Sequence, residues 1–199
     1  MKLLWLLILC PLLSFGQCIL SDQVTANPAP VGGLYQPGTV VTFTYTVSAY
    51  QGLSVNWMHG IAVNAGLGWT AITPVGTPTN NSGGGTWLWV NSVTSSATGI
   101  TVSRPGWFYD SGLGGPLDGN PGNNYGDGLT GPWTFRWRAT VVGCPPGQDG
   151  ATLSLIIENY ADGETGSWIN YDCQGDPNES FQATLDCCQP FVTGQILHN

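Results

Sequence analysis

Residues 133–142 read WTFRWRATVV, and this stretch decides the fold class because apolar and polar side chains alternate along it. A period of two places every second side chain on the same face of an extended strand, which is typical of a strand with one buried face. The aromatic and β-branched residues favour the same conformation. Residues 41–49, VTFTYTVSA, repeat the pattern. The sequence therefore predicts at least these strands as parts of a half-buried sheet.

Shorter segments of the same kind are separated by connections rich in glycine and proline. The chain contains 29 Gly and 14 Pro, spaced at strand-length intervals, and no stretch carries a sustained helical period. This pattern predicts an all-β protein, an antiparallel β-sandwich of either the immunoglobulin-like or the jelly-roll kind. The further strands that we expect lie at residues 55–63, 70–75, 86–93, 99–103, 151–159 and 180–186.

The N-terminus has the features of a signal peptide. Lys2 precedes an apolar run at residues 3–13, and the small residues Ser14 and Gly16 suit cleavage before Gln17. An alternative is lipid attachment to the following cysteine, although the residues before it match such sites poorly. The apolar run is short for a bilayer span, so we expect no membrane insertion after the signal is removed.

A length of 199 residues suits a single ordinary domain. We predict a signal peptide at residues 1–16, one β-sandwich domain at residues 17–189, and a C-terminal tail or the start of a linker at residues 190–199.

Charged residues are scarce, at 8% of the chain, and the formal net charge is -8. After removal of Lys2, the remaining cations are Arg104, Arg136 and Arg138. Binding to nucleic acid or to an anionic membrane surface needs a basic patch, so we expect neither partner.

An exported chain folds in an oxidising compartment, which favours disulfides. Cys18, Cys144, Cys173, Cys187 and Cys188 follow the predicted signal, so one cysteine is left over. We expect one bridge between Cys144 and Cys173, and a second from Cys18 to Cys187 or Cys188. A zinc site is disfavoured, because paired C-x-x-C spacing and a nearby histidine are both missing.

The alternating pattern stops at residues 105–132, PGWFYDSGLGGPLDGNPGNNYGDGLTGP. Loops of this length are usually functional or disordered, and the embedded aromatic residues favour an ordered loop. Oxygen-bearing side chains among glycines are typical of a calcium site, while a loop rich in Asx turns is the alternative. No other cofactor is indicated. The candidate calcium ligands are Asp110, Asp118, Asn120, Asn123 and Asp127.

Aromatic residues in this loop or at strand ends form a second candidate site, because sugars stack on exposed aromatic rings. The alternative is that these rings cap the ends of the sandwich. The candidates for ligand binding are Trp69, Trp107, Tyr109, Tyr125 and Trp168.

Five motifs stand out along the chain, namely GTVVTFTY at 38–45, NWMHGI at 56–61, GNPGNNYGD at 119–127, GPWTF at 131–135 and DGETGSW at 162–168. Together they resemble the N-terminal β modules of large exported surface proteins of Bacteroidota, of the gliding-motility-associated and type IX secretion cargo type. The resemblance covers nearly all of the mature chain. It implies a surface-exposed β module and carries no established chemistry.

No catalytic set stands out in the sequence. His59 alternates onto the face that should be buried, and a G-x-S-x-G motif is missing. Acidic residues such as Glu158 could form a glycosidase pair, but sequence spacing does not establish their separation. We therefore expect a non-enzymatic secreted or cell-surface module for adhesion or ligand binding, whose extracellular ligand is a glycan or a protein. The alternatives are a carbohydrate-binding or carbohydrate-cleaving jelly roll and a structural spacer.

Overall fold

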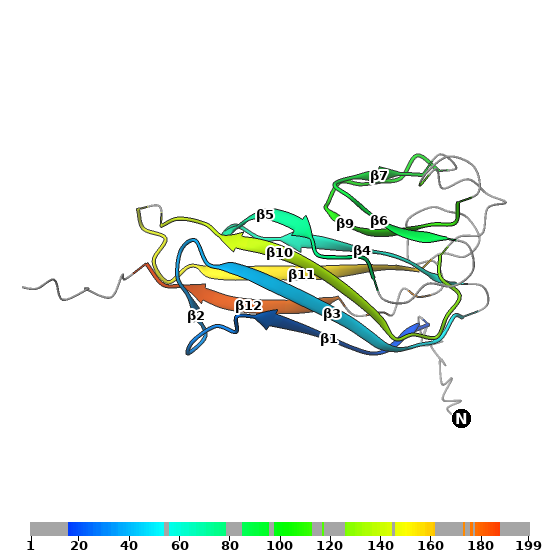
Figure 1. Cartoon of the computed structure of the whole chain (residues 1–199), viewed down its shortest axis with the longest axis horizontal. Helices are drawn as coiled ribbons and strands as arrows, with labels where there is room; N and C mark the ends of the chain where they lie inside the picture. Colours follow the sequence, from blue (N-terminus) through cyan, green and yellow to red (C-terminus); the bar gives the residue numbers. More distant parts are fainter. Residues whose placement is uncertain are drawn as a thin grey trace, which may run out of the picture.

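A computed structural model of the chain describes residues 16–53, 56–78, 85–95, 98–112, 117, 126–144, 146–161, 173, 176 and 178–187. All regular structure in these residues is β-structure, and two sheets pack face to face (Figure 1). The predicted all-β sandwich is confirmed. None of the described segments forms an apolar helix of membrane-spanning length.

The smaller main sheet has four antiparallel strands and contains both of the strands with the clearest alternation. Its order is β1 (Ile19–Asn27), β3 (Val40–Tyr50), β10 (Trp133–Val141) and β5 (Trp69–Pro74).

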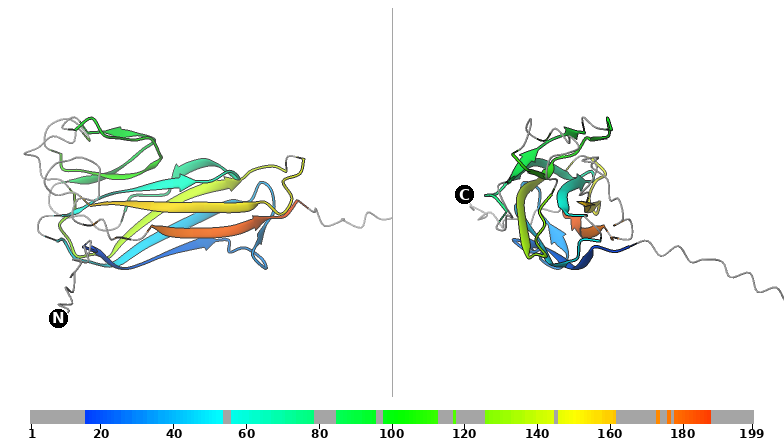
Figure 2. Two further views of the ribbon diagram at one scale, coloured as in Figure 1. Left: turned by 180° about the vertical axis from the view of Figure 1, so that it is seen from behind. Right: turned by 90° about the vertical axis from the view of Figure 1, so that its right-hand side faces the viewer.

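The larger sheet has six strands and is antiparallel except for the short parallel pairing of β2 with β12. Its order is β2 (Leu34–Tyr35), β12 (Glu179–Leu185), β11 (Thr152–Ala161), β4 (Met58–Ala65), β9 (Gly106–Asp110) and β6 (Thr86–Val90). A separate hairpin of β7 (Val93–Thr94) and β8 (Thr101–Val102) lies near β6 and β9 at one end of the sandwich (Figures 1 and 2).

The core lies between the two sheets, and the alternation in β3 and β10 decides which side chains enter it. Phe43 stacks on Trp137 with 5.8 Å between ring centroids, and Tyr45 stacks on Phe135 at 6.2 Å. All of these rings are fully buried. The strand predictions at residues 41–49 and 133–142 are therefore confirmed, including the face that each buries.

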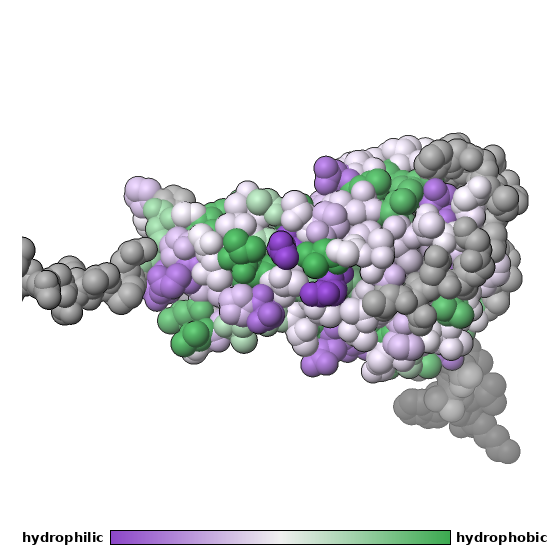
Figure 3. All heavy atoms as spheres, viewed as in Figure 1, coloured by the Kyte–Doolittle hydropathy of each residue, from purple (hydrophilic) through white to green (hydrophobic). Residues whose placement is uncertain are grey.

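The outer face of the four-stranded sheet carries the intervening polar residues. Figure 3 shows this face as a mosaic of near-neutral, hydrophobic and strongly hydrophilic patches. Thr42 lies opposite Arg138 and Thr44 opposite Arg136 across the β3–β10 pair. Hydroxyl groups and these two arginines, rather than a large patch of charged residues, make this surface polar.

The sequence prediction missed β1 and β2, because no strand was expected before residue 41. β1 is an edge strand with the sequence ILSDQVTAN, and most of its side chains are exposed or half-buried. An edge strand of this kind shows no regular apolar alternation, because little of its surface enters the core. The expected loop at residues 105–132 was also partly wrong, because its first residues form β9.

The predicted faces of the segment at residues 55–63 need correction as well. Met58 begins the strand, and Trp57 precedes it and is half-buried. Alternation places Gly60 and Ala62 on the face opposite the buried His59, yet both are buried as well. Ala62 packs with Val93 of the hairpin and with Phe108, so the outer face of β4 is covered by a second, smaller apolar cluster.

The predicted cysteines form the disulfides, but the predicted pairing was wrong. Cys18 bonds to Cys173, and Cys144 bonds to Cys187. The strand register explains why the observed disulfide pairing differs from the predicted one. Ile19 lies opposite Tyr50 at the end of β3, whereas the end of β10, just before Cys144, lies opposite the start of β3. Cys18 and Cys144 thus lie at opposite ends of the sandwich, where Cys18 bonds to Cys173 and Cys144 bonds to Cys187. Since the Cys18 sulfur is in a disulfide, it is not available for lipid attachment.

Candidate functional site

Polar side chains converge on Glu158 at the outer face of the six-stranded sheet. Leu155, Ile157 and Asn159 of β11 point into the core and are buried, so the intervening Glu158 and Tyr160 point outward. The neighbouring strand β4 supplies Asn64, and the connection between β8 and β9 supplies Arg104. Segments far apart in the chain therefore meet at one carboxylate.

Both oxygens of Glu158 accept hydrogen bonds. The Asn64 amide donates to Oε1 at 3.2 Å, and the Tyr160 hydroxyl donates to Oε2 at 3.0 Å. Arg104 Nη1 forms an ion pair with the same Oε2. The carboxylate thereby orients an aromatic hydroxyl and a guanidinium group at the same time.

Burial, and secondly the negative charge of Glu158, raise the pKa of Tyr160 above its usual value. The hydroxyl therefore stays protonated and acts as a donor. The Arg104 side chain is 44% exposed and that of Glu158 is 18% exposed. An ion pair so close to solvent contributes only about 0–1 kcal/mol to stability.

A hollow of about 360 Å³ lies beside this cluster. Its size falls near the lower end of ligand pockets, which run from about 300 to 1,000 Å³. Hydroxyl groups, a guanidinium group and one aromatic ring face it, with a small aliphatic contribution. The lining residues are Ile100, Thr101, Val102, Ser103, Arg104 and Tyr160.

The predicted aromatic platform is wrong for its described members. Trp69 contacts Phe43 edge-on in the core at 5.2 Å between ring centroids. Trp107 and Tyr109 belong to β9 and pack edge-on against tryptophans of β6. The exposed fractions of these side chains are 7%, 3% and 3%, so none can stack on an external sugar. Tyr125 and Trp168 lie outside the described residues.

The described members of the predicted calcium site use their carboxylates in local turns. Asp110 Oδ1 accepts the backbone N–H of Gly112 at 3.0 Å, and Asp127 Oδ1 accepts that of Leu129 at 3.0 Å. Both contacts are Asx turns, the alternative that the sequence left open. The remaining candidates, Asp118, Asn120 and Asn123, lie outside the described residues, and calcium binding stays a prediction.

Within the described ranges, Cys18, Cys173 and Asp176 make up the one group of three potential metal-ligand side chains. Its two sulfurs are joined in a disulfide, so the group is not a metal site. His59 is buried on β4, as the alternation predicts.

Sequence reasoning missed the convergence on Glu158, although two signals pointed to its members. Arg104 is one of the few cations in an acidic chain, and such a residue often has a specific acidic partner. Glu158 and Tyr160 are two residues apart in a predicted strand, which places them on the same face. The sequence could not show that the β8–β9 connection brings Arg104 to that face.

The sequence matches no known protein-family model and no curated protein. Among solved structures, the chain is similar to a cohesin module from a family 33 glycoside hydrolase of Clostridium perfringens, with 8% sequence identity and a TM-score of 0.40. The match covers 85% of this chain and 98% of the cohesin module.

Proposed function

We propose that the chain is a secreted or cell-surface module that binds a neutral, hydroxyl-rich ligand, a glycan, in the hollow beside Arg104 and Tyr160. The observation that carries the proposal is the convergence of Arg104, Tyr160 and Asn64 on the single carboxylate of Glu158 at the edge of that hollow.

The chemistry of the lining supports a neutral sugar. A sugar hydroxyl both donates and accepts hydrogen bonds. Arg104 retains further N–H donors, and the Ser103 hydroxyl both donates and accepts, whereas the Thr101 hydroxyl is already hydrogen-bonded to that of Thr94 at 2.8 Å. The charges of Arg104 and Glu158 offset each other, so the hollow favours no strongly charged ligand. The half-buried ring of Tyr160 adds an apolar surface for the carbon face of a sugar.

The extracellular setting rests on separate observations. Two disulfides are typical of a protein that folds in an oxidising compartment. The predicted signal peptide and the resemblance to exported surface modules of Bacteroidota support the same setting. In such a setting a glycan-binding module would attach its carrier to polysaccharide or to another cell.

Binding is tested by a glycan array followed by titration calorimetry with the best ligands. We expect Arg104→Ala to weaken binding by at least about tenfold, which corresponds to about 1.4 kcal/mol. Tyr160→Phe removes only the hydroxyl and should weaken binding less. The matched control is Arg138→Ala, because Arg138 lies on the outer face of the opposite sheet and should leave affinity unchanged.

The melting temperatures of all variants are measured alongside, so that a folding defect is distinguished from a lost contact. Absence of binding across a broad glycan panel, or equal affinity of the Arg104→Ala variant, would overturn the proposal. Release of reducing sugars during the incubation would show that the chain cleaves the glycan instead of only binding it.

A further inference from the structure

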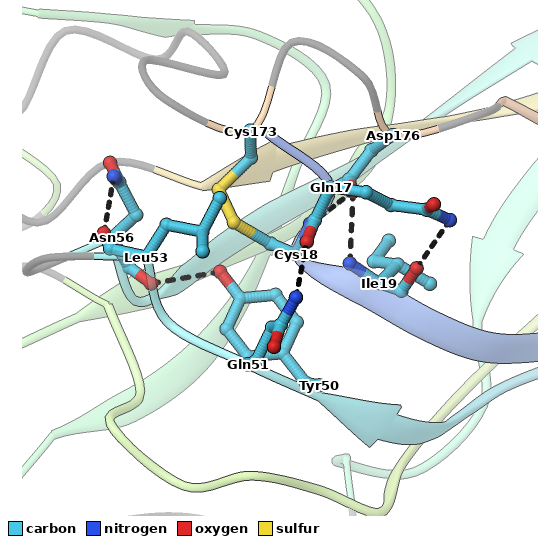
Figure 4. Close-up of a disulfide and its surroundings, with 9 residues drawn as sticks. All are labelled: Gln17, Cys18, Ile19, Tyr50, Gln51, Leu53, Asn56, Cys173 and Asp176. Carbon is cyan, nitrogen blue, oxygen red and sulfur yellow. Dashed lines mark hydrogen bonds between the residues drawn. A yellow bond between two sulfur atoms is a disulfide. The ribbon is translucent and has the colours of Figure 1, made fainter. Parts of the chain in front are cut away.

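The start of the domain is held by one carboxylate, that of Asp176. Its Oδ1 accepts the backbone N–H of Cys18 at 2.6 Å and that of Ile19 at 2.9 Å (Figure 4). Asp176 is positioned for this by its own backbone N–H, which donates to the Cys173 carbonyl at 3.0 Å, and Cys173 is bonded to Cys18. The disulfide and the carboxylate thus act on the same few atoms of backbone.

A second set of contacts places the residue before Cys18. The Gln51 side chain donates to the Gln17 carbonyl at 2.9 Å, and the Gln51 backbone N–H donates to the Cys18 carbonyl at 2.8 Å. The Gln17 side chain folds back and donates to the Ile19 carbonyl at 2.7 Å. The chain is therefore already in a defined position at the predicted cleavage point.

The Asp176 carboxylate can accept further hydrogen bonds. Its second oxygen, Oδ2, is buried and has no hydrogen-bond partner in the described structure. Burial is the main cause that raises the pKa of Asp176, two backbone N–H groups lower it, and Asp22 raises it further. Leaving a buried acceptor unpaired is unfavourable, so a cationic donor at this place would stabilise the fold.

We propose that the Asp176 carboxylate receives the α-ammonium group of Gln17, which is created when the signal peptide is removed. The distance permits it. Cys18 N lies 2.6 Å from Asp176 Oδ1 and consecutive backbone nitrogens are at most about 3.7 Å apart, so the Gln17 nitrogen lies at most about 6.3 Å from that oxygen, and rotation of the freed amine about the Gln17 ψ angle closes the remaining distance. Hydrolysis of the Gly16–Gln17 amide releases a carboxylate on Gly16 and an amine on Gln17. That amine has an ordinary pKa of about 7.7–8.0 and is mostly protonated at neutral pH.

Processing therefore changes the site from an uncharged amide to a cation beside a buried carboxylate, and the mature chain becomes more stable than its precursor. Cyclisation of Gln17 to pyroglutamate would cancel the gain. In that reaction the amine attacks Cδ, the bond from Cδ to Nε2 breaks and ammonia leaves, so the product carries no charge. The contact of Nε2 with the Ile19 carbonyl and the pairing of the amine both oppose this reaction.

The composition of the chain permits a specific test. The single lysine, Lys2, lies in the predicted signal peptide, so the mature chain has one amine, that of Gln17. An amine-selective acetylating reagent applied to the secreted protein therefore modifies this group alone. We expect acetylation to lower the melting temperature by about 2–4 °C, the shift that corresponds to about 1 kcal/mol in a domain of this size. In Asp176→Asn, the same treatment should cause little or no shift.

The matched control is Asp149→Asn. Asp149 also accepts a backbone N–H from a disulfide-bonded cysteine, that of Cys187 at 2.8 Å, but far from the N-terminus. This variant should keep the full response to acetylation. The pH dependence of the acetylation rate gives a second readout that a purely structural role of Asp176 would not move. The ion pair should raise the pKa of the amine above about 8.0 in the wild type.

Intact-mass analysis of the secreted protein identifies its first residue. A mature chain that begins elsewhere, or that is entirely pyroglutamate, would refute the proposal. So would an unchanged melting temperature after acetylation, or an equal shift in Asp176→Asn. If Asp176→Asn does not fold, the amine pKa of the wild type decides, and an ordinary value counts against the ion pair. Each result is independent of glycan binding at Arg104.

Discussion

At the scale of single residues, the carboxylate of Asp22 on β1 affects the pKa values of two neighbouring groups, Tyr45 and Glu179. The buried Tyr45 hydroxyl donates to Asp22 at 2.7 Å, and Asn159 lies 3.0 Å from it. Burial first, and then the charge of Asp22, raise the pKa of Tyr45, so this hydroxyl remains a donor. Asp22 also acts on Glu179, whose pKa is raised first by partial burial and then by the Asp22 charge. Negative charge is therefore concentrated where β1 meets β12.

Glu179 should make stability depend on pH. Its pKa in the folded state is raised, so the folded chain holds the proton more tightly than the unfolded chain does. This contribution to stability is fully present below the unfolded pKa, near 4.5, and is lost as the pH rises through the folded value. Glu179→Gln should therefore raise the free energy of unfolding at pH 7, with the gain disappearing at about pH 4 and below.

Urea denaturation of both proteins across this pH range measures the effect. Asp22→Asn serves as the second background, in which the gain from Glu179→Gln should shrink because one cause of the raised pKa is removed. A difference between variant and wild type that does not change with pH would contradict the assignment.

At the scale of elements, the close approach of β4 and β9 determines where the candidate site lies. A Cβ atom at Gly106 would sit 2.1 Å from the Ile61 carbonyl oxygen and 2.9 Å from the Ala62 Cα. Only glycine allows the two backbones to pack this closely. Gly106 also follows Arg104 by two residues, so the same contact positions the guanidinium over Glu158.

Gly106→Ala should lower the free energy of unfolding by about 1–3 kcal/mol, because backbone atoms must move to admit the methyl group. The control is Gly143→Ala, where a Cβ meets nothing within 4 Å. Guanidinium denaturation compares the two variants. Equal stabilities would show that the β4–β9 contact tolerates a side chain.

At the scale of the whole molecule, the disulfides join the two sheets at both ends of the sandwich. Cys18 and Cys173 are 155 residues apart in sequence, and Cys144 and Cys187 are 43 apart. β1 and β12 are neighbours across the sandwich in Figure 1, which brings the first bridge to the end where the chain enters. The bridges thus restrain the N-terminal entry and the exit of β12 separately.

Removing either bridge should destabilise the fold, and the longer loop should matter more. Chain entropy predicts a loss of about 5 kcal/mol for Cys18→Ser with Cys173→Ser, and about 4 kcal/mol for Cys144→Ser with Cys187→Ser. Denaturant unfolding of the two double variants measures these losses, and peptide mapping of the wild type confirms the pairing. A map that joins Cys144 to Cys173 would contradict the structure.

The sequence by itself determined the fold class and the inward faces of its principal strands. This was possible at residues 41–49 and 133–142 because the period of side chains along a strand is a local property. It also identified the bridge-forming cysteines. The prediction of faces failed at β4, because the β7–β8 hairpin and Phe108 cover its outer face, and a local period does not reveal such cover.

The tertiary structure alone decided which residues become neighbours. Sheet order and register bring Cys18 to Cys173, take Trp107 and Tyr109 into the core, and bring Arg104 to Glu158. The ion pair joins residues that are 54 positions apart in the sequence, and the disulfide joins residues that are 155 positions apart. No local period encodes such distances, because they depend on how separate strands pack and on which face a connecting loop crosses.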